Sequence, residues 1–488
     1  MSAPSVEQRR VDGQTGAGPQ FADGVIAILA PAEKGTADKL YSVSDWTQVF
    51  ATFGGGILSE TAAYVGPRVR RPMIVGRVTP SVDGTYSDIS VTNPAGVTPS
   101  APTAGTSKPW DDFSIVIRFL AAGTVGNAGI RYQTSKDGGV TFARALALGT
   151  ATSINVPGTG ASVNLGTGGV IVGTTWTFKT TAPAATAADF AELEKKLKAT
   201  SLDFEAVLKV FPANATAITA GEALLTDWES KKKYVIGLLN VRPMDLTAED
   251  EADYLGELQG IYDTAGTSIR QAVGADGAYD VSLITKQRRF YPASVVAAAK
   301  TFGLPLGTDP AEVDLGPTTA NIRDADGNAI AWDEETTPGL DDLRFSTLRT
   351  FPGRSGSFVT NVNMFSPVGS DYVWIQHARC MNRALKVGNF ALTQCLSRKL
   401  RPDPELGPNG EMYVAQGDIN EIQSEVTRQI RAALDGQVAG VQFIVPNRVV
   451  IPGNGPTTVT GNVELLPFAY LKKIVANYLF VRALTAST

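Results

Sequence analysis

Residues that could hold a phosphate gather near the start of the chain, in the stretch GVIAILAPAEKGTADKLYSVSDWTQVFATFGGG at 24–56. A phosphate-binding loop needs a glycine, four further residues and then Gly-Lys-Ser/Thr, so that backbone N–H groups and the lysine face the phosphate. Here Lys34 precedes Gly35, and no glycine stands five residues before Gly35. The three glycines at 54–56 follow an expected helix, whereas anions bind at helix N-termini. The stretch therefore predicts no nucleotide site, and we expect no cofactor.

A second candidate is the pair formed by His377, the only histidine, and Cys380. At a helical spacing of three residues both side chains would share one face and could bind a metal ion. A structural zinc site takes four ligands, however, and no third ligand is identifiable. As a base and a nucleophile the two residues lack an orienting partner, and no G-x-S-x-G elbow occurs. We expect no metal site and no catalytic residue, and we predict that the chain is not an enzyme.

The stretch SKDGGVTF at 135–142 matches the Asp-box pattern S-x-D-x-G-x-T-aromatic, which recurs in every blade of sialidase propellers. Here the pattern occurs once. We expect a hairpin in which Tyr132 and Thr134 alternate into the Lys-Asp-Gly-Gly turn and Val140 and Phe142 alternate out of it. The pattern leaves open an alternative function, a carbohydrate- or surface-binding tail component.

The elements that would position these residues begin with a strand–helix–strand unit. An apolar strand at 24–30 is followed by a helix with Ser44 as N-cap and Gly54 at its end, and then by the strand RPMIVGRV at 71–78. From about 186 strands and helices alternate again, which is typical of a mostly parallel sheet covered by helices. We therefore predict a discontinuous α/β core domain over 21–84 and 183–340. An α/β enzyme built on this core is a further alternative.

The remaining segments differ in composition from this core. Residues 1–20 are polar and glycine-rich and read as an extended arm. Residues 85–182 contain many short alternating runs and predict a β-rich insertion domain. From 341 to 488 we expect an α+β C-terminal domain.

Two helices dominate the expected C-terminal domain. The first covers WIQHARCMNRALKVGNFALTQCLSRKL and is interrupted at Gly388. It contains Cys380 and Cys395, about 22 Å apart along a helix, which is too far for a disulfide. In the second helix Asp418 is the expected N-cap, and Glu421 would complete a capping box.

The bulk composition excludes several classes of protein. The chain has 488 residues and a net charge of -5, which argues against direct binding of nucleic acid. The charge is uneven, since the part from Asp341 onward is basic and the rest is acidic, so copies of the chain could attract one another head to tail. The start MSAPSVEQRR lacks the apolar core of a signal peptide. No apolar run reaches about 18 residues, so we expect no membrane insertion.

Three quoted segments carry a resemblance to a known family. GVIAILAPAEKGT, SVSDWTQVFATFGGG and RPMIVGRV resemble, in this order, the N-terminal motif of the contractile tail sheath proteins of bacteriophages. That family has a strand GVxxIxGxAxKGP, a helix S-x-x-E/D-F-x-x-x-FGG and a strand ending in Arg-Val. The segment FLAAGTVGNAGIRYQTS is similar to the family's A-x-x-x-G-x-x-G-N-x-I-x-V.

The C-terminal part is also similar to this family. GSDYVWIQHARCMNRALKVGNFAL stands where the family has D-W-x-Y-x-x-V-x-R, and TGNVELLPFAYLKKIVANYLF stands where it has G-x-x-E-x-x-x-x-P-x-x-P-A-E-F-I. The second proline and the glutamate of the last motif are replaced by YLKK. Related proteins of the family also serve R-type bacteriocins and other contractile injection systems.

The resemblance implies a structural function. It also implies that the insertion domain at 85–182 faces outward and that the C-terminal domain at 341–488 ends in an inter-subunit strand. The chain would polymerise helically around an inner tail tube and contract to drive the tube through the envelope of a target cell. The implied partners are other copies of the chain, the inner tail tube protein, and baseplate and tail terminator proteins. The implied location is the virion tail, assembled in the cytoplasm of the bacterial host.

The resemblance also implies which segments make contacts, because the N-terminal arm and the C-terminal strand of the family pair with sheets of neighbouring subunits. We expect inter-subunit contacts at Val6, Val11, Val463, Leu465, Ile474, Ala476, Tyr478 and Phe480. We expect the residues that face the tube to be Arg428, Arg431, Lys472 and Lys473.

Overall fold

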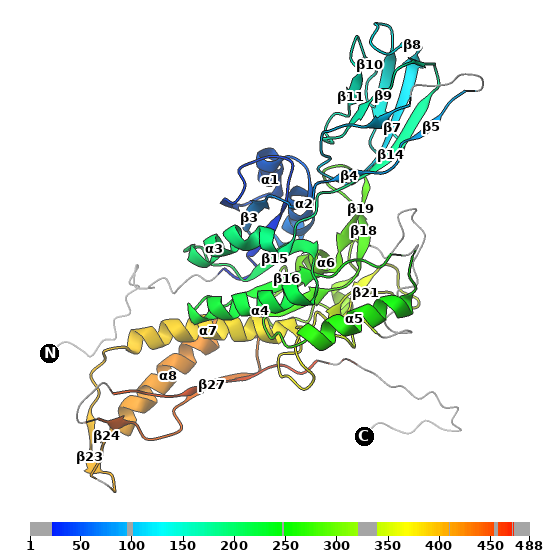
Figure 1. Ribbon diagram of the computed structural model, residues 1–488. Coiled ribbons are helices and arrows are strands. Elements are labelled where there is room, and N and C mark those ends of the chain that lie inside the picture. Colours follow the sequence, from blue (N-terminus) through cyan, green and yellow to red (C-terminus); the bar gives the residue numbers. More distant parts are fainter. Residues whose placement is uncertain are drawn as a thin grey trace, which may run out of the picture. The chain divides into compact units, whose positions relative to one another are not determined.

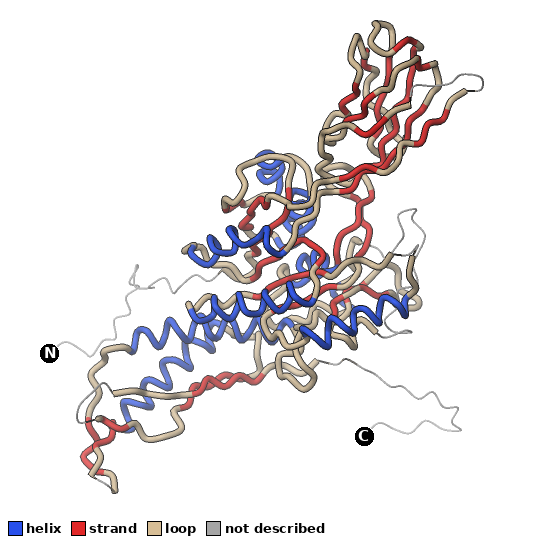
Figure 2. The backbone as a smooth tube through the Cα atoms, viewed as in Figure 1, coloured by secondary structure: helices blue, strands red, loops and turns tan. Residues whose placement is uncertain are grey.

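The computed structural model (Figures 1 and 2) forms two compact units that divide between Gln394 and Cys395. It describes residues 22–94, 101–245, 248–320, 339–408, 410–452, 457–470 and 472. The expected arm at 1–20 therefore lies outside the described residues.

A seven-stranded sheet forms the centre of the first unit, and its order is β2-β3-β1-β15-β16-β17-β20. All neighbouring strands run parallel except β2, which pairs with β3 in the antiparallel sense. Strand β1 is buried along its whole length, as expected for a strand in the middle of a covered sheet. The mixed α/β fold class is confirmed. The strands are β1 (Ile26–Pro31), β2 (Leu40–Val43), β3 (Met73–Val78), β15 (Ala206–Pro212), β16 (Ile236–Asn240), β17 (Gln271–Gly274) and β20 (Phe345–Ser346).

Helices pack around this sheet, with α2 against α6 and β1, and α4 against α5 and β16. Helix α1 begins one residue later than expected, because Asp45 and not Ser44 accepts the hydrogen bond from Thr47 N. Helices α2 and α6 were not predicted, since both are buried nearly all round and show no polar face. The helices are α1 (Trp46–Phe53), α2 (Ile57–Val69), α3 (Ala191–Ala199), α4 (Ala215–Ser230), α5 (Glu251–Ala265), α6 (Ala293–Thr301) and α7 (Ile375–Cys395).

The insertion has a β-rich architecture and its own apolar core. Its larger sheet has the order β10-β9-β7-β14-β4, and β5 also pairs with β14. The rings of Phe119 and Trp176 pack edge to face in this core, with centroids 4.7 Å apart. The strands are β4 (Thr85–Tyr86), β5 (Ser90–Thr92), β7 (Phe113–Ala121), β9 (Arg131–Ser135), β10 (Leu146–Ala147) and β14 (Thr175–Thr181).

The Asp-box segment forms a turn but not the predicted hairpin. The Asp137 carboxylate accepts a hydrogen bond from Thr141 N at 2.9 Å, which satisfies the turn locally. Val140 is 83% exposed and belongs to no strand. The strand that returns along β9 is β10, with Leu146 opposite Tyr132. The prediction that Val140 belongs to the returning strand was wrong, because Thr141 N bonds to the Asp137 side chain and this segment stays in the turn.

In its described residues the second unit holds one long helix, α8 (Gln416–Ala433), and two small sheets. Its three-stranded sheet contains β23 (Pro402–Leu406), β24 (Met412–Val414) and β26 (Val450–Ile451). Asp418 is not the N-cap of α8, which starts after Ala415. The Asp418 carboxylate instead binds the guanidinium and backbone N–H of Arg401.

Two further differences concern the segment after residue 340. Residues from Leu340 to Ala378 contribute to the core of the first unit, through Phe345, Met364 and Ile375 among others. The compact units therefore divide near 394, whereas the sequence suggested 341. Helix α7 runs unbroken through Gly388, which is buried within it.

A buried ion pair fastens α7 to the central sheet. The guanidinium of Arg379, 2% exposed, binds the carboxylate of Glu205 just before β15. Arg379 Nη1 also donates to the carbonyl of Thr301 at 2.9 Å, and the Glu205 carboxylate accepts from Gly24 N. One side chain of α7 thus joins the starts of β1 and β15 to the end of α6.

We predict that Arg379→Met lowers the free energy of unfolding by about 3 kcal/mol, because it leaves the Glu205 carboxylate buried without its partner. Urea denaturation measures the change. The matched control is Lys198→Met, which breaks a largely exposed pair with Asp227 and should cost less than about 1 kcal/mol. Equal losses in the two variants would contradict this role of Arg379.

Candidate functional sites

The backbone around Gly55 forms a contact site for the insertion domain, here called the seat. The indole ring of Trp110 lies against Gly55, so that a Cβ at Gly55 would come within 2.1 Å of the ring. The Glu33 carboxylate accepts the Gly55 N–H at 2.9 Å, which uses the donor that a phosphate would need. The stretch that suggested a nucleotide loop therefore serves to bring Trp110 close to the backbone of the core.

We predict that Gly55→Ala lowers the free energy of unfolding by about 2 kcal/mol, because the added methyl group overpacks the seat. Trp110→Ala should also destabilise the chain, since it removes the packed ring. In the double variant the clash is absent. The loss of unfolding free energy in the double variant should therefore be smaller, by at least about 1 kcal/mol, than the sum of the losses in the two single variants. A double-mutant cycle in urea measures this coupling, and strict additivity would show that the ring does not occupy the seat.

Next to this seat lies a cluster of charged groups in which both carboxylates are buried and the Arg289 side chain is partly exposed. Asp111, from the insertion, pairs with Arg289 on β19 (Arg288–Pro292). Glu60, on α2 and 1% exposed, accepts hydrogen bonds from Ser282 Oγ at 2.6 Å and from the Tyr291 hydroxyl at 3.3 Å. Among the described residues, one oxygen each of Asp111 and Glu60 has no hydrogen-bond partner.

The cluster holds two carboxylates and one guanidinium. Burial raises the pKa of Asp111 to about 6, the positive charge of Arg289 opposes this shift, and the negative charges of Asp112 and Glu60 add to it. We therefore expect Asp111 to retain a proton in the folded chain under mildly acidic conditions.

We predict that Asp111→Asn changes how stability depends on pH. The pKa of Asp111 is raised above its unfolded value, so the stability that this group contributes falls as the pH rises from about 4 to about 6. Relative to wild type, the asparagine variant should gain about 2 kcal/mol over this range, because it cannot ionise. Urea denaturation at several pH values tests this. The exposed Asp88→Asn should follow wild type, and parallel curves for all three proteins would refute the prediction.

His377 and Cys380 both lie on α7 and do not form a reactive pair. The ring of His377 packs on Trp374, with centroids 5.2 Å apart. Burial raises the pKa of the Cys380 thiol to about 12, so the thiol is protonated and is a poor nucleophile. Across the described residues no group of three or more His, Cys, Asp or Glu side chains could hold a metal ion. No helix in the described part of the chain is long and apolar enough to span a membrane.

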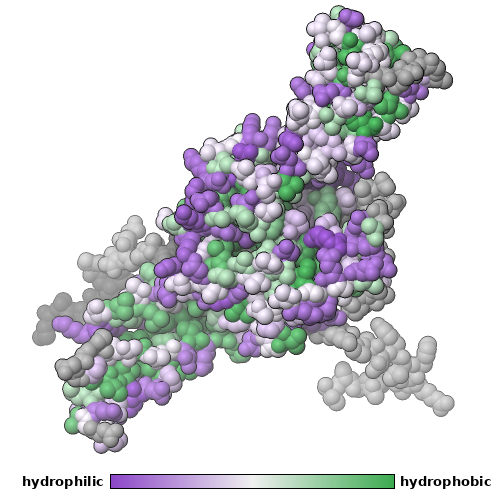
Figure 3. Space-filling view, in the orientation of Figure 1, coloured by the Kyte–Doolittle hydropathy of each residue, from purple (hydrophilic) through white to green (hydrophobic). Residues whose placement is uncertain are grey.

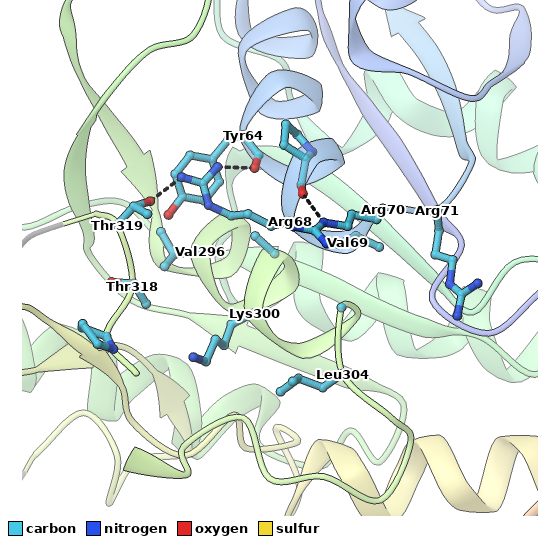
Figure 4. A pocket seen from close by; sticks show the side chains of 14 residues that line it. Tyr64, Arg68, Val69, Arg70, Arg71, Val296, Lys300, Leu304, Thr318 and Thr319 are labelled. Carbon is cyan, nitrogen blue, oxygen red and sulfur yellow. Dashed lines mark hydrogen bonds between the residues drawn. The ribbon is translucent and has the colours of Figure 1, made fainter. Parts of the chain in front are cut away.

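A cavity of about 550 Å³ opens between the C-terminal ends of α2 and α6 (Figure 4). Arg68 lies over the ring of Tyr64 and donates to the Tyr64 carbonyl, and Lys300 donates to the carbonyls of Leu315 and Gly316. These cations satisfy carbonyl groups near helix ends, as cations commonly do. The described lining contains no Asp, Glu, His or Cys, so it offers none of the common general bases.

The second unit presents a candidate assembly surface on a two-stranded ribbon. Strands β25 (Gly440–Ile444) and β27 (Asn462–Leu466) pair in the antiparallel sense, and α8 packs against β25. The register places Phe443 opposite Val463 and Val441 opposite Leu465. A two-stranded ribbon is only marginally stable by itself and gains from additional strands.

The register also decides which backbone groups of β27 point outward. Phe443 and Val441 direct backbone groups away from β27, toward α8. In an antiparallel pair, directly opposed residues both face inward or both face outward. Val463 and Leu465 therefore direct N–H and C=O groups to the outer side of β27. No partner for these groups occurs among the described residues.

Apolar side chains remain exposed near this edge. Leu466 is 63% exposed and Phe468 is 40% exposed. The face of the second unit seen in Figure 3 shows apolar residues scattered between polar ones. An open backbone edge beside exposed apolar side chains is the kind of surface to which another strand adds.

The expected contact residues thus divide into two groups. Val463 and Leu465 lie on the open edge of β27, and Arg428 and Arg431 lie on α8. Arg428 pairs with Glu425, and Lys472 is exposed beyond β27. These assignments stay predictions. The other expected residues, Val6, Val11, Lys473, Ile474, Ala476, Tyr478 and Phe480, lie outside the described residues.

A family model described as DUF2586, N-terminal domain, matches residues 3–363. No curated protein matches the sequence. Among solved structures, the fold is similar to a chain of an extracellular contractile injection system, the PVC sheath complex in its contracted state. The TM-score is 0.50 at 9% identity, and the match covers 98% of each chain.

Two other solved structures are also similar to the chain. A chain of the contracted anti-feeding prophage baseplate has a TM-score of 0.49 at 12% identity and covers 98% of each chain. A sheath tail protein from Desulfitobacterium hafniense has a TM-score of 0.44 at 10% identity, covering 95% of this chain and 100% of its own.

Proposed function

The chain belongs to the family described as DUF2586, and we propose that it is the structural subunit of a contractile sheath. The observation that carries this proposal is the open outer edge of β27, on a ribbon too small to be complete by itself. The shared fold with a chain of a contractile injection system sheath complex supports it. The described residues offer no catalytic constellation, which favours a structural role over an enzymatic one.

Assembly would proceed by exchange of strands. An extended segment of one copy adds to the outer edge of β27 in another copy and bonds to the backbone of Val463 and Leu465. The polar arm at 1–20 and the residues after β27 are the segments proposed to do this. Such a contact joins two different surfaces, so it does not close on itself and generates a helical polymer.

The polymer would surround an inner tube and attach to baseplate and terminator proteins. We place Arg428, Arg431, Lys472 and Lys473 on the side that faces the tube. Contraction would be a mechanical rearrangement of packed subunits, in which energy stored in inter-subunit contacts drives the tube forward. The location would be the tail of a virion or of a related injection device.

We predict that Leu465→Pro abolishes assembly while the subunit stays folded. Proline removes the outward N–H of Leu465 but leaves the ladder to β25 intact, because the hydrogen bonds of that ladder come from the neighbouring residues. Negative-stain electron microscopy should show sheath-like tubes for wild type and none for this variant.

Leu465→Ala is the matched control, since it shortens the side chain but keeps the N–H, and it should still form tubes. Tubes of normal appearance from Leu465→Pro would refute the proposed edge. Absence of tubes from the wild-type chain in every condition would refute the proposed function.

A further inference from the structure

The cavity between α2 and α6 carries more positive charge than the described residues neutralise. Its lining includes Arg68, Arg70, Arg71 and Lys300 and no carboxylate (Figure 4). Arg68 forms an ion pair with Asp280 at 3.0 Å. The other three cations have no carboxylate partner among the described residues, and Arg70 and Arg71 are exposed to solvent. The cavity therefore presents three positive charges that an anionic partner could neutralise.

An opposite surplus of charge lies at the start of α5. Between residues 242 and 257 the sequence holds six acidic residues and one cation, Arg242, which pairs with two of the acids. Asp250, Glu251 and Asp253 have no cationic partner in the described part of the chain, and Asp250 and Asp253 are exposed. Asp250 accepts the N–H of Asp253 at 2.9 Å, which caps the helix but balances neither charge. Three negative charges thus remain on this surface.

The two charged surfaces lie at opposite edges of the central sheet. The end of α2 leads directly into β3, and the last carbonyl of α6 bonds to Arg379, whose partner Glu205 precedes β15. The cavity therefore lies near the amino ends of the parallel strands. Tyr254, in the first turn of α5, instead bonds to Arg242 and Asp276, which follow β16 and β17. One chain cannot bring the two surfaces together, whereas two copies can.

We propose that the cationic cavity of one copy binds the acidic start of α5 in a second copy. This inference rests on the proposed sheath function and names a further contact between copies, separate from the edge of β27. The cavity volume of about 550 Å³ leaves room for several carboxylate side chains. Complementary charges also fix the register of a contact and disfavour other arrangements. Because the contact joins two different surfaces, it can repeat from copy to copy along a helical polymer.

Reversing the charge on either surface tests this contact. Arg71→Glu places a carboxylate opposite the acids of α5, and Asp253→Arg places a guanidinium opposite the cations of the cavity. Each variant alone should raise the subunit concentration at which tubes appear by light scattering about fivefold, because an exposed attraction becomes a repulsion. Lys195→Glu makes the same change of charge as Arg71→Glu at an exposed site on α3 outside the cavity, and it should behave as wild type.

Mixing the two variants separates the contact from damage to folding. In an equal mixture the unchanged cavity of Asp253→Arg meets the unchanged acids of Arg71→Glu, and the two reversed surfaces also attract each other. The mixture and the double variant should therefore form tubes at the wild-type concentration. A wild-type threshold in either single variant would overturn the contact. So would a mixture that assembles no better than the single variants, and both results would leave the sheath function intact.

A second measurement does not depend on tube formation. Leu465→Pro blocks the addition of a strand at β27, and Arg71→Lys in the same chain keeps the charge and introduces an amine. A carbodiimide joins this amine to a carboxylate in direct contact, and mass spectrometry of mixed isotope-labelled and unlabelled chains identifies links between copies.

Links from the introduced amine to Asp250, Glu251 or Asp253 of another copy would support the contact. Their absence at the highest soluble concentration would overturn it. If the wild-type chain forms no tubes, the sheath function fails, and the cross-link still decides about the contact.

Discussion

The ion pair between Arg379 and Glu205 is the constraint on which the first unit depends. It is buried, and its members come from α7 and from the start of β15, 174 residues apart in the chain. Removing a charge pair from water is costly, so such a pair persists only where further hydrogen bonds surround it. Here the carbonyl of Thr301 and the N–H of Gly24 provide them. The pair thereby connects the segment that leads toward the second unit with the centre of the sheet.

The central sheet of the first unit and the ribbon of the second unit differ in how many of their backbone N–H and C=O groups are paired within the chain. The central sheet of the first unit has seven strands with helices packed around it, and β1 has a partner on both sides. Among the described residues, the ribbon of the second unit has two strands, and side chains of the chain itself cover only one of its outer edges. Backbone N–H and C=O groups must be paired or hydrated. Unpaired groups at the edge of the ribbon can therefore bond to a strand of another copy, whereas the paired groups inside the central sheet cannot. This contrast, more than any single residue, supports the proposed sheath function.

Several local features could be predicted from the sequence and others could not. The strands β1 and β15 were predictable because they are apolar runs bounded by turn residues, and α8 because its apolar residues recur with a helical period. Strand β17 was missed, since its four residues QAVG carry no alternation and its pairing with β16 is parallel and distant in sequence. Capping was predicted less well. Asp418 is of a residue type that often caps helices, yet its carboxylate binds Arg401 instead of the backbone of α8. Local sequence preferences cannot predict this contact, because Arg401 lies 17 residues away in the chain.

The sequence by itself determined the fold class, the β-rich character of the insertion and the absence of a phosphate-binding loop, since these depend on periodicity and on the order of neighbouring residues. Only the tertiary structure decided what Gly55 does, because the ring that needs its small size, Trp110, lies 55 residues further along the chain. The same holds for the edges of the ribbon. The register with β25 decides that the N–H groups of Val463 and Leu465 point outward, and the acceptor of the Phe443 N–H is the Thr427 hydroxyl of α8. Contacts between distant segments set these features, and no local pattern encodes them.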